Sequence, residues 1–251
     1  MIELLDTKDA LTQGTGKGVI ITVLDTGIDA THPFFAKAHI LPQIEFDETL
    51  VAREVEAHDS VGHGTAIAGI IHRLAPKATL LPIRVLTSGP RQGRHQLIHQ
   101  GALEAIKRKA QILNCSFGAP ATAHTCLLYK QWVDLAFDND STIVTASSNL
   151  DSSIDEWPSA FRTTLATTYA ELEAAQWLVR KGSIPFAAAG HDIEVPIPGG
   201  GTSLRSGSSF AAAHLTSMIA RLLSSNPNLS PSALREILTH HAKQKPSNQV
   251  G

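Results

Sequence analysis

Short apolar runs rich in β-branched residues recur along the chain, and segments with helical periodicity separate several of them. The first run, GVIITVL at 18–24, ends at Asp25-Thr26-Gly27, which is typical of a buried strand that leads into a turn. In the segments 95–109 and 125–137, by contrast, the apolar residues fall on one helical face. Strands that alternate with such helices predict an α/β fold with a mostly parallel central sheet and helices on both faces. Further strand-like runs lie at 79–86, 111–117, 142–146, 163–167 and 184–187.

The last third of the chain is predicted to be helical. Segment 208–223 is rich in alanine and other apolar residues, as expected for a helix packed tightly among its neighbours. A second helix begins after Ser230, which is a favoured N-cap and is followed by proline at the first helical position. No linker rich in proline, serine and glycine divides the chain. We therefore expect a single domain over 1–251, with an N-terminal lead-in at 1–17 and a frayed tail at 244–251.

Composition excludes several classes of protein. With 43% apolar residues among 251, the chain can bury a sizeable core and does not have the composition of a disordered protein. The formal net charge of −2 argues against a nucleic-acid partner. No apolar stretch approaches the ~20 residues that cross a bilayer, so no membrane span is expected. Cys115 and Cys126 could pair, but two cysteines indicate no disulfide framework. The N-terminal sequence lacks a secretory signal, so we expect a cytoplasmic protein unless a leader has been removed.

Asp25 stands where a parallel sheet would place a functional residue. In open α/β sheets, ligands bind outside the carboxyl ends of the strands, and Asp25 ends the first strand in VLDTG. An aspartate at such a position can equally be a turn-forming residue. This position alone leaves both roles open.

His63 lies in DSVGHGT at 59–65, directly before an apolar run that predicts a helix. The chain has 12 histidines, and a single histidine is more often a packing or surface residue than a functional one. Gly62 and Gly64, on either side of it, favour a functional role, because glycines allow close backbone approach and unusual dihedral angles.

Ser209 lies in SGSSFAAAH at 206–214, a stretch of small residues that leads into the alanine-rich helix. A hydroxyl there lies in the field of a helix N-terminus, although Ser208 or Ser209 could also be a plain N-cap. A second candidate, Ser203, follows Gly-Thr but precedes Leu-Arg-Ser-Gly rather than an alanine run. We therefore favour Ser209 over Ser203.

The three candidates together specify one kind of chemistry. A serine hydroxyl is unreactive until a neighbouring base takes its proton, and a histidine base needs a carboxylate to fix its tautomer and stabilise its positive charge. Asp25, His63 and Ser209 could supply these roles, and they follow one another in one of the chain orders known for this geometry.

At these motifs the chain resembles the subtilisin-like serine proteases, the subtilases. VLDTGID at 23–29 is similar to the family's aspartate motif, GHGTAIAG at 62–69 to its histidine motif and GSSFAAAH at 207–214 to its serine motif. The resemblance covers nearly the whole chain. It implies a subtilisin-like three-layer sandwich and the activity of a serine endopeptidase.

The resemblance also implies a role for each site residue. Ser209 would attack the scissile carbonyl of a peptide or protein substrate, His63 would accept the proton, and Asp25 would orient His63. Asn149, at the end of TIVTASSN, would stabilise the oxyanion. No cofactor is implied. An extended substrate would pair, as an added β-strand, with Ser116, Phe117 and Gly118.

Three departures from the family pattern bear on the site. Ala213 stands where the family usually has proline, and Ser148 replaces the glycine that usually precedes the oxyanion asparagine. The loop that holds Ca²⁺ in many secreted members is missing, because LAPKA directly follows the histidine helix, and Phe34 occupies the position of a calcium-binding aspartate. Since Ca²⁺ takes six or more oxygen ligands, we predict no metal site.

The sequence also indicates how the proteolytic activity of such an enzyme would be limited. The chain starts close to the first strand, which leaves no room for the inhibitory pro-region typical of secreted subtilases, so we expect that this region was trimmed or that the enzyme folds without one. A cytoplasmic protease without one needs narrow specificity, an inhibitor or a regulatory partner, so we expect a selective processing protease. Two alternatives stay open: a peptide-binding pseudoprotease, and a peptide ligase or macrocyclase in which an amine captures the acyl-enzyme.

Overall fold

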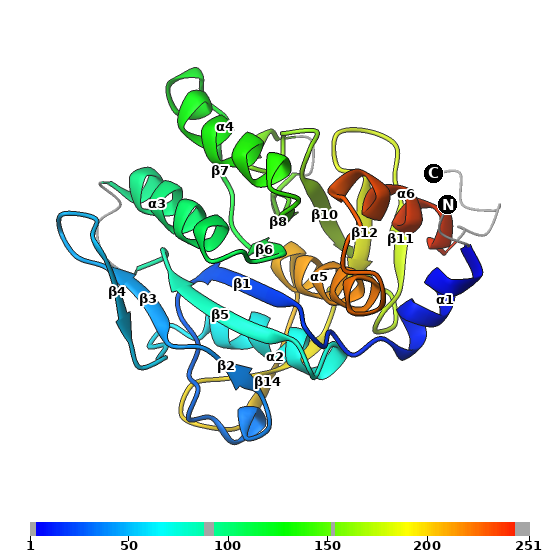
Figure 1. The fold of residues 1–251 in the computed structure, drawn as a ribbon, viewed down its shortest axis with the longest axis horizontal. Coiled ribbons are helices and arrows are strands. Elements are labelled where there is room, and N and C mark those ends of the chain that lie inside the picture. The colour runs from blue at the N-terminus through cyan, green and yellow to red at the C-terminus, as the bar shows by residue number, and fades with distance from the viewer. Residues whose placement is uncertain (1–3, 88–92, 152–153, 244–251) are drawn as a thin grey trace.

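The computed structural model describes residues 4–87, 93–151 and 154–243. Within these residues, six parallel strands form the centre of a ten-stranded sheet (Figure 1). The β-branched and apolar runs of the sequence supply them, since such side chains suit strands that are buried on both faces. In sheet order the six are β12 (Phe186–Ala189), β10 (Leu165–Ala170), β8 (Thr142–Ala146), β6 (Ile112–Cys115), β1 (Ile20–Asp25) and β5 (Thr79–Arg84).

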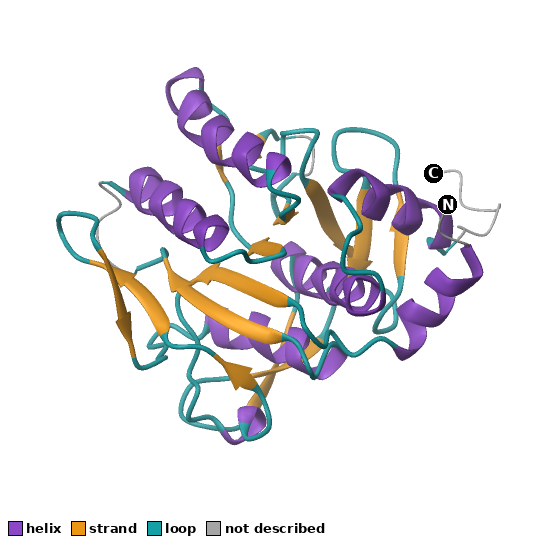
Figure 2. Ribbon diagram, in the orientation of Figure 1, coloured by secondary structure: helices purple, strands orange, loops and turns teal. Residues whose placement is uncertain are grey.

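Shorter strands complete both edges of the sheet (Figure 2). At one edge, β11 (Trp177–Val179) runs antiparallel to β12. At the other edge, β3 (Gln43–Phe46) pairs in parallel with β5, and β4 (Ala52–Val55) runs antiparallel to β3. The two-residue strand β2 (His39–Ile40) also pairs with β5.

Helices cover both faces of the sheet. Helices α2 (His63–Leu74) and α5 (Ser208–Ser225) pack against each other and against one face. Helices α3 (Arg94–Lys107) and α4 (Ala123–Asp138) lie together on the other face (Figure 1). This arrangement places the first residues of α2 and α5 near the carboxyl ends of the central strands.

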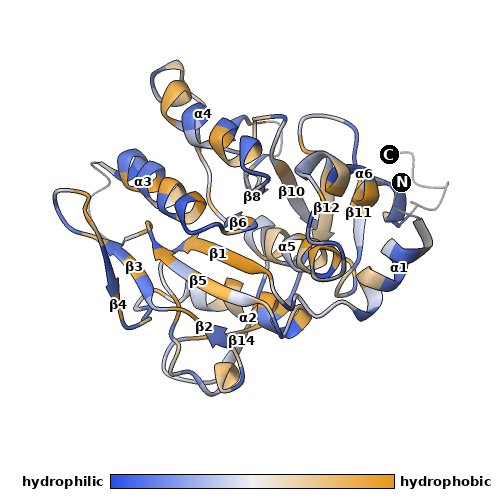
Figure 3. Ribbon diagram, in the orientation of Figure 1, coloured by the Kyte–Doolittle hydropathy of each residue, from blue (hydrophilic) through white to orange (hydrophobic). Residues whose placement is uncertain are grey.

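Alternation along the strands divides the core into two layers. In β1, Ile21 and Val23 point toward α2 and α5, whereas Leu24 points toward α3 and α4. Successive side chains of a strand point to opposite faces, so a strand buried on both faces is apolar throughout. Figure 3 shows β1 as a hydrophobic strand at the centre of the molecule.

The two ends of the described chain lie close together (Figure 1). Within the expected lead-in at 1–17, the structure has helix α1 (Leu4–Gln13), which packs on α5. Helix α6 (Pro231–His241) begins as the sequence predicts, because the Ser230 side chain accepts a hydrogen bond from the Ala233 N–H. The expected tail at 244–251 lies outside the described residues.

Three small elements lie outside the sheet. A 3-10 helix, η1 (Pro33–Phe35), follows β1. Two separate antiparallel pairs are formed by β13 (Ile193–Pro196) with β14 (Thr202–Arg205), and by β7 (Ala119–Pro120) with β9 (Glu156–Trp157).

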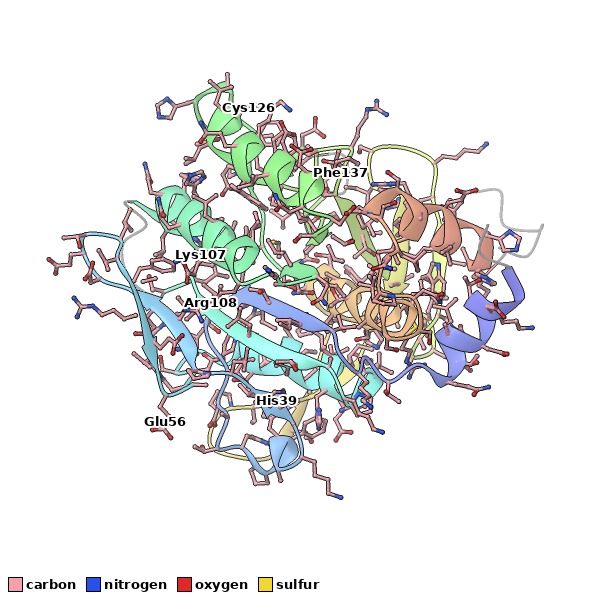
Figure 4. The ribbon with its side chains drawn as sticks, viewed as in Figure 1. His39, Glu56, Lys107, Arg108, Cys126 and Phe137 are labelled. Atoms are coloured by element: carbon pink, nitrogen blue, oxygen red, sulfur yellow. The ribbon has the colours of Figure 1, made fainter. Side chains whose placement is uncertain are left out.

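The two cysteines are not paired. Cys115 is buried in β6, whereas Cys126 lies on α4 near its outer end (Figure 4). Burial raises the pKa of the Cys115 thiol far above its ordinary value, so this side chain behaves as a small apolar residue of the core.

Candidate active site

Asp25 is the last residue of β1, at the centre of the sheet, and its side chain is fully buried. Its carboxylate Oδ1 accepts a hydrogen bond from the backbone N–H of Thr26 at 2.8 Å. The same carboxylate faces the ring of His63, whose Nδ1 lies 2.7 Å from Oδ1 and 2.9 Å from Oδ2. A buried carboxylate requires such partners, because its desolvation is otherwise costly.

His63 is the first residue of α2, and its position depends on the backbone around it. Gly62, the N-cap, has φ +94°, a conformation that glycine adopts without strain. At Gly64 a Cβ would collide with the carbonyl oxygen of Gly27 and approach the Asp25 Cβ to 3.1 Å. The glycines that flank His63 therefore let α2 approach the end of β1 closely enough for the aspartate–histidine contact.

Asp59 closes the N-terminal turn of α2, a role that the sequence analysis did not assign. Its Oδ1 accepts the backbone N–H groups of Val61 and Gly62, and its Oδ2 accepts both the N–H and the hydroxyl of Thr65. The first N–H groups of a helix have no partner inside the helix, and a carboxylate there is favoured by the helix dipole. The signal in the sequence is an acidic residue four positions before His63.

Charges around His63 favour its protonated form. The pKa of His63 is raised above its ordinary value, chiefly because the Asp25 carboxylate stabilises the imidazolium. Asp59 acts in the same direction, whereas desolvation and the positive charge of Arg205 act against it. A histidine held in this way is a base of increased strength.

Ser209 lies in the first turn of α5 and is half-buried. Its hydroxyl donates a hydrogen bond of 3.1 Å to the carbonyl oxygen of Ser116. Between described residues, no hydrogen bond joins this hydroxyl to His63. The next residue, Phe210, contacts the His63 ring with 6.2 Å between the ring centroids. The structure thus pairs Asp25 with His63 and brings α5 against His63, but directs the Ser209 hydroxyl to the Ser116 carbonyl.

Asn149 follows β8 and lies at the start of α5. Its side-chain Oδ1 accepts the backbone N–H of Ser208 at 2.8 Å. The Nδ2 amide group of Asn149 forms no hydrogen bond with another described residue. The Ser208 hydroxyl donates to the carbonyl of Ser147 at 2.6 Å, so two hydrogen bonds join the segment after β8 to the start of α5.

Ser116, Phe117 and Gly118 continue from β6 and lead into β7. Among the described residues they have no strand partner, so they are a free segment between two paired ones. Gly118 is exposed, whereas Ser116 and Phe117 are buried. An unpaired extended segment of this kind can accept a peptide as an added strand.

A buried network of hydrogen bonds joins Ser116 to β6 and α5. Thr216 on α5 donates from its hydroxyl to Asn114 Oδ1 at 2.9 Å, and Asn114 Nδ2 donates to the Ser116 hydroxyl at 2.8 Å. The Ser116 hydroxyl in turn donates to the carbonyl of Ser209 at 3.1 Å. Asn114 and Thr216 were missed in the sequence, where the signal is an asparagine within the otherwise apolar run ILNC.

Ser203, the rejected alternative, lies on β14 rather than at the start of a helix. Its hydroxyl accepts a hydrogen bond from Arg205 Nε at 3.1 Å. Arg205 itself lines a cavity of about 320 Å³, which His63 also lines. The remaining lining residues are Val61, Gly62, Ala66, Val195, Ile197, Pro198 and Phe210.

The side chains of residues 4–87, 93–151 and 154–243 include no group of three or more histidines, cysteines, aspartates or glutamates placed to hold a metal ion. Within the same part of the chain, no helix is long and apolar enough to cross a membrane.

The fold and these side chains define a class of protein. An α/β sheet that presents an aspartate–histidine pair at a strand end, together with a serine at a helix start, is typical of serine hydrolases. Residues 16–251 match the family model described as the subtilase family, so the chain belongs to the subtilases. The expected family is thereby confirmed, and the serine endopeptidases of this family hydrolyse peptide bonds.

Individual relatives agree with the family match. The chain is 28% identical over 235 residues to an intracellular serine protease of Paenibacillus polymyxa. The alignment covers 87% of this chain and 71% of the relative. Among solved structures, fervidolysin from Fervidobacterium pennivorans, a keratinolytic enzyme, is similar with a TM-score of 0.78 and 21% identity, over 96% of this chain and 41% of that one. The prenylagaramide maturation protease PagA is similar with a TM-score of 0.70 and 22% identity, over 94% and 86%. The predicted α/β fold is thus confirmed, and the chain spans less than half the length of fervidolysin.

Proposed function

We propose that this chain is a serine endopeptidase that forms an acyl-enzyme on Ser209. The observation that carries the proposal is the contact of the buried Asp25 carboxylate with His63 Nδ1 at 2.7 Å. When Nδ1 carries a proton that it donates to Asp25, the lone pair of the neutral ring is on Nε2. That nitrogen can then act as a general base.

The reaction follows from these positions. His63 Nε2 takes the Ser209 hydroxyl proton as Oγ forms a bond to the scissile carbonyl carbon. The C–N bond then breaks, and His63 gives the proton to the leaving amine. Water then attacks the acyl carbon while His63 Nε2 takes a proton from it, and His63 returns that proton to the Ser209 oxygen as the Ser209–acyl bond breaks and the acid product leaves. For the first step, the Ser209 hydroxyl must turn from the Ser116 carbonyl toward His63.

Asn149 is proposed as a donor to the oxyanion, together with the backbone N–H of Ser209. Its Oδ1 is held by the Ser208 N–H, which supports this role because the Nδ2 donors are then fixed in direction. Such a preorganised donor stabilises charge that develops only in the transition state, and its loss costs roughly 2.7–4 kcal/mol in subtilisin itself.

Ser116, Phe117 and Gly118 are proposed to bind an extended substrate by adding it as a strand. The Ser116 carbonyl, which now accepts the Ser209 hydroxyl, would accept a backbone N–H of the substrate instead. Substrate binding would thereby release the nucleophile toward His63, so one event both positions the peptide and frees the hydroxyl.

We further propose a selective processing protease that acts in the cytoplasm. A relative named as an intracellular serine protease and a similar structure named as a maturation protease support this choice. Efficient cleavage of one defined peptide, beside weak digestion of casein, is the expected pattern. Rapid and general digestion of casein would contradict selectivity. An inhibitor or regulatory partner is a further expectation.

A fluorophosphonate probe tests the proposed nucleophile. We expect the wild-type protein to take up one probe, located on Ser209 by mass spectrometry, and the Ser209→Ala variant to take up none. A Ser203→Ala variant is the matched control, because Ser203 follows Gly-Thr much as Ser209 follows Gly-Ser. This variant should be labelled as the wild type is.

A second candidate function is peptide binding without turnover. The hydrogen bond from the Ser209 hydroxyl to Ser116, in place of one to His63, is the observation that favours it. The same labelling experiment separates the two functions, because a pseudoprotease would bind peptides but leave Ser209 unlabelled. Capture of the acyl-enzyme by an amine would instead yield a cyclic product that has lost one water.

A further inference from the structure

Glu156 lies at the edge of the substrate-binding segment. In the pairing of β7 with β9, Glu156 is opposite Pro120. Gly118 is two residues before Pro120 and therefore shares its face, as a diagonal neighbour of Glu156. A Cβ built on Gly118 would lie 2.6 Å from the Glu156 carboxyl carbon. The carboxylate thus occupies the space that any other residue at 118 would fill.

The charge of Glu156 is uncompensated. Burial is the cause that raises the pKa of its carboxyl group. Within the described chain, this carboxylate has no ion pair and no hydrogen bond. A partly buried carboxylate without a partner has lost some of its hydration without compensation. The unpaired Glu156 carboxylate, beside the exposed Gly118, can therefore bind a cationic group of a ligand.

The distance to the nucleophile defines which substrate residue could reach it. The Ser209 hydroxyl is 3.1 Å from the Ser116 carbonyl, so the substrate residue that is attacked lies beside Ser116. Gly118 is two residues further along, or roughly 7 Å in an extended strand. A long side chain is needed to span this distance, and a short apolar side chain would leave the carboxylate unpaired.

We propose that Glu156 makes the enzyme specific for lysine or arginine at the residue that donates the acyl group. The inference rests on the proposed endopeptidase function and names its substrate class. The cationic head of that residue pairs with the Glu156 carboxylate, while its aliphatic stem lies along Gly118. The surface at Gly118 shares no residue with the cavity that Arg205 lines, so the positive charge of Arg205 does not belong to this subsite.

Four peptides that differ only at the acyl-donating residue test this specificity. The residues are arginine, citrulline, leucine and glutamate, and citrulline keeps the shape of arginine without its charge. For the wild-type protein we expect kcat/KM to be about tenfold or more higher for arginine than for citrulline, the range of a charge-assisted hydrogen bond. In Glu156→Gln the ratio should fall to near one. In Glu156→Lys the glutamate peptide should become preferred over the arginine peptide.

Asp155→Asn is the matched control. Asp155 is the neighbouring carboxylate and is exposed, and successive residues of an extended segment point to opposite sides. Its replacement should leave the arginine-to-citrulline ratio unchanged. Equal cleavage of arginine and citrulline by the wild type, a preference for leucine, or a ratio that Glu156→Gln does not alter would each overturn the proposal.

Binding to the Ser209→Ala variant separates this inference from the proposed function. If no peptide is cleaved and Ser209 is not labelled, the peptidase function fails. The Kd values of the arginine and citrulline peptides then still test the subsite. Tighter binding of the arginine peptide that Glu156→Gln abolishes supports it, and equal Kd values contradict it.

Discussion

The buried carboxylate of Asp25 and the imidazole of His63 form the central interaction of the site at the scale of single residues. The carboxylate is fully buried, whereas the His63 side chain keeps 32% of its surface exposed. The aspartate therefore contacts the ring from the protein interior, while part of the ring stays accessible to solvent. In the proposed mechanism this contact sets the tautomer of His63.

Replacing Asp25 by asparagine should abolish most of the activity. The amide is of similar size, but it can donate a hydrogen bond to Nδ1 and so favour the wrong tautomer of His63. We expect kcat to fall by about 10⁴-fold, as for the same change in another triad protease, with KM changed much less. Steady-state kinetics with one defined peptide measures this, and a loss of less than tenfold would contradict the role of Asp25.

The pH dependence of kcat/KM should report the charges around His63. His63 must be neutral to act as a base, and its pKa is raised, so the acidic limb should lie above pH 6.5. Arg205 lowers this pKa, so Arg205→Gln should move the limb to higher pH. Arg53→Gln is the control, since Arg53 pairs with Asp47 on the surface and should leave the limb in place. A shift to lower pH in Arg205→Gln would contradict this account.

At the scale of elements, the starts of α2 and α5 carry the site, and each start is fixed by side chains outside its own helix. Asp59 accepts N–H groups of the first turn of α2, and the Asn149 side chain accepts the Ser208 N–H at the start of α5. These contacts satisfy N–H groups that a helix cannot satisfy internally. The Ser147 carbonyl also accepts the Ser208 hydroxyl. They also fix where His63 and Ser209 lie relative to the sheet.

Removal of the Asp59 carboxylate should loosen α2 at His63. In Asp59→Ala the buried N–H groups of Gly62 and Thr65 lose their acceptor, so we expect the free energy of unfolding to fall by about 2 kcal/mol. Urea denaturation measures this. Asp47→Ala is the control, because Asp47 accepts similar bonds from Thr49 and Val51 in an exposed loop, and its loss should matter less. Equal effects of the two changes would contradict the role of Asp59.

His214 makes the stability of α5 depend on pH. It is buried in α5, and desolvation lowers its pKa to about 4. The unfolded chain, with a histidine pKa near 6.5, therefore binds a proton that the folded protein excludes as the pH falls from 6.5 toward 4. The free energy of unfolding therefore falls by about 2 kcal/mol between pH 7.5 and pH 5.

Substitution of His214 tests this dependence. In His214→Gln the contribution is removed, so the free energy of unfolding should fall less steeply with acidification than in the wild type. Urea denaturation at pH 7.5 and pH 5 gives the two slopes. His240→Gln, on α6, is a control that should keep the wild-type slope. Equal slopes for His214→Gln and the wild type would show that His214 can be protonated without loss of the fold.

At the scale of the whole molecule, the sequence predicted the centre of the sheet and the large helices but not the edges. The central strands were predictable because they are buried on both faces, and their apolar runs reflect this. Strands β3 and β4 were missed because they are short and mixed in polarity. Helix α1 was missed because its apolar residues are few and α5 supplies its packing.

The site could be predicted only in part, for a related physical reason. Asp25, His63 and Ser209 stand in local motifs of small residues that are visible in the sequence. Asn114, Thr216 and Glu156 act through neighbours that are distant along the chain, and no local pattern marks them. The orientation of the Ser209 hydroxyl toward Ser116 is a rotamer choice, set by a tertiary contact that spacing along the chain does not encode.

The most direct test of the central claim is mass spectrometry of the enzyme quenched in acid during turnover of a peptide ester. We expect a covalent adduct of the acyl peptide on the fragment that contains Ser209, with an amplitude near one per active enzyme. The adduct should be missing in Ser209→Ala. Turnover of the ester by Ser209→Ala at the wild-type rate, or an adduct on another residue, would contradict it.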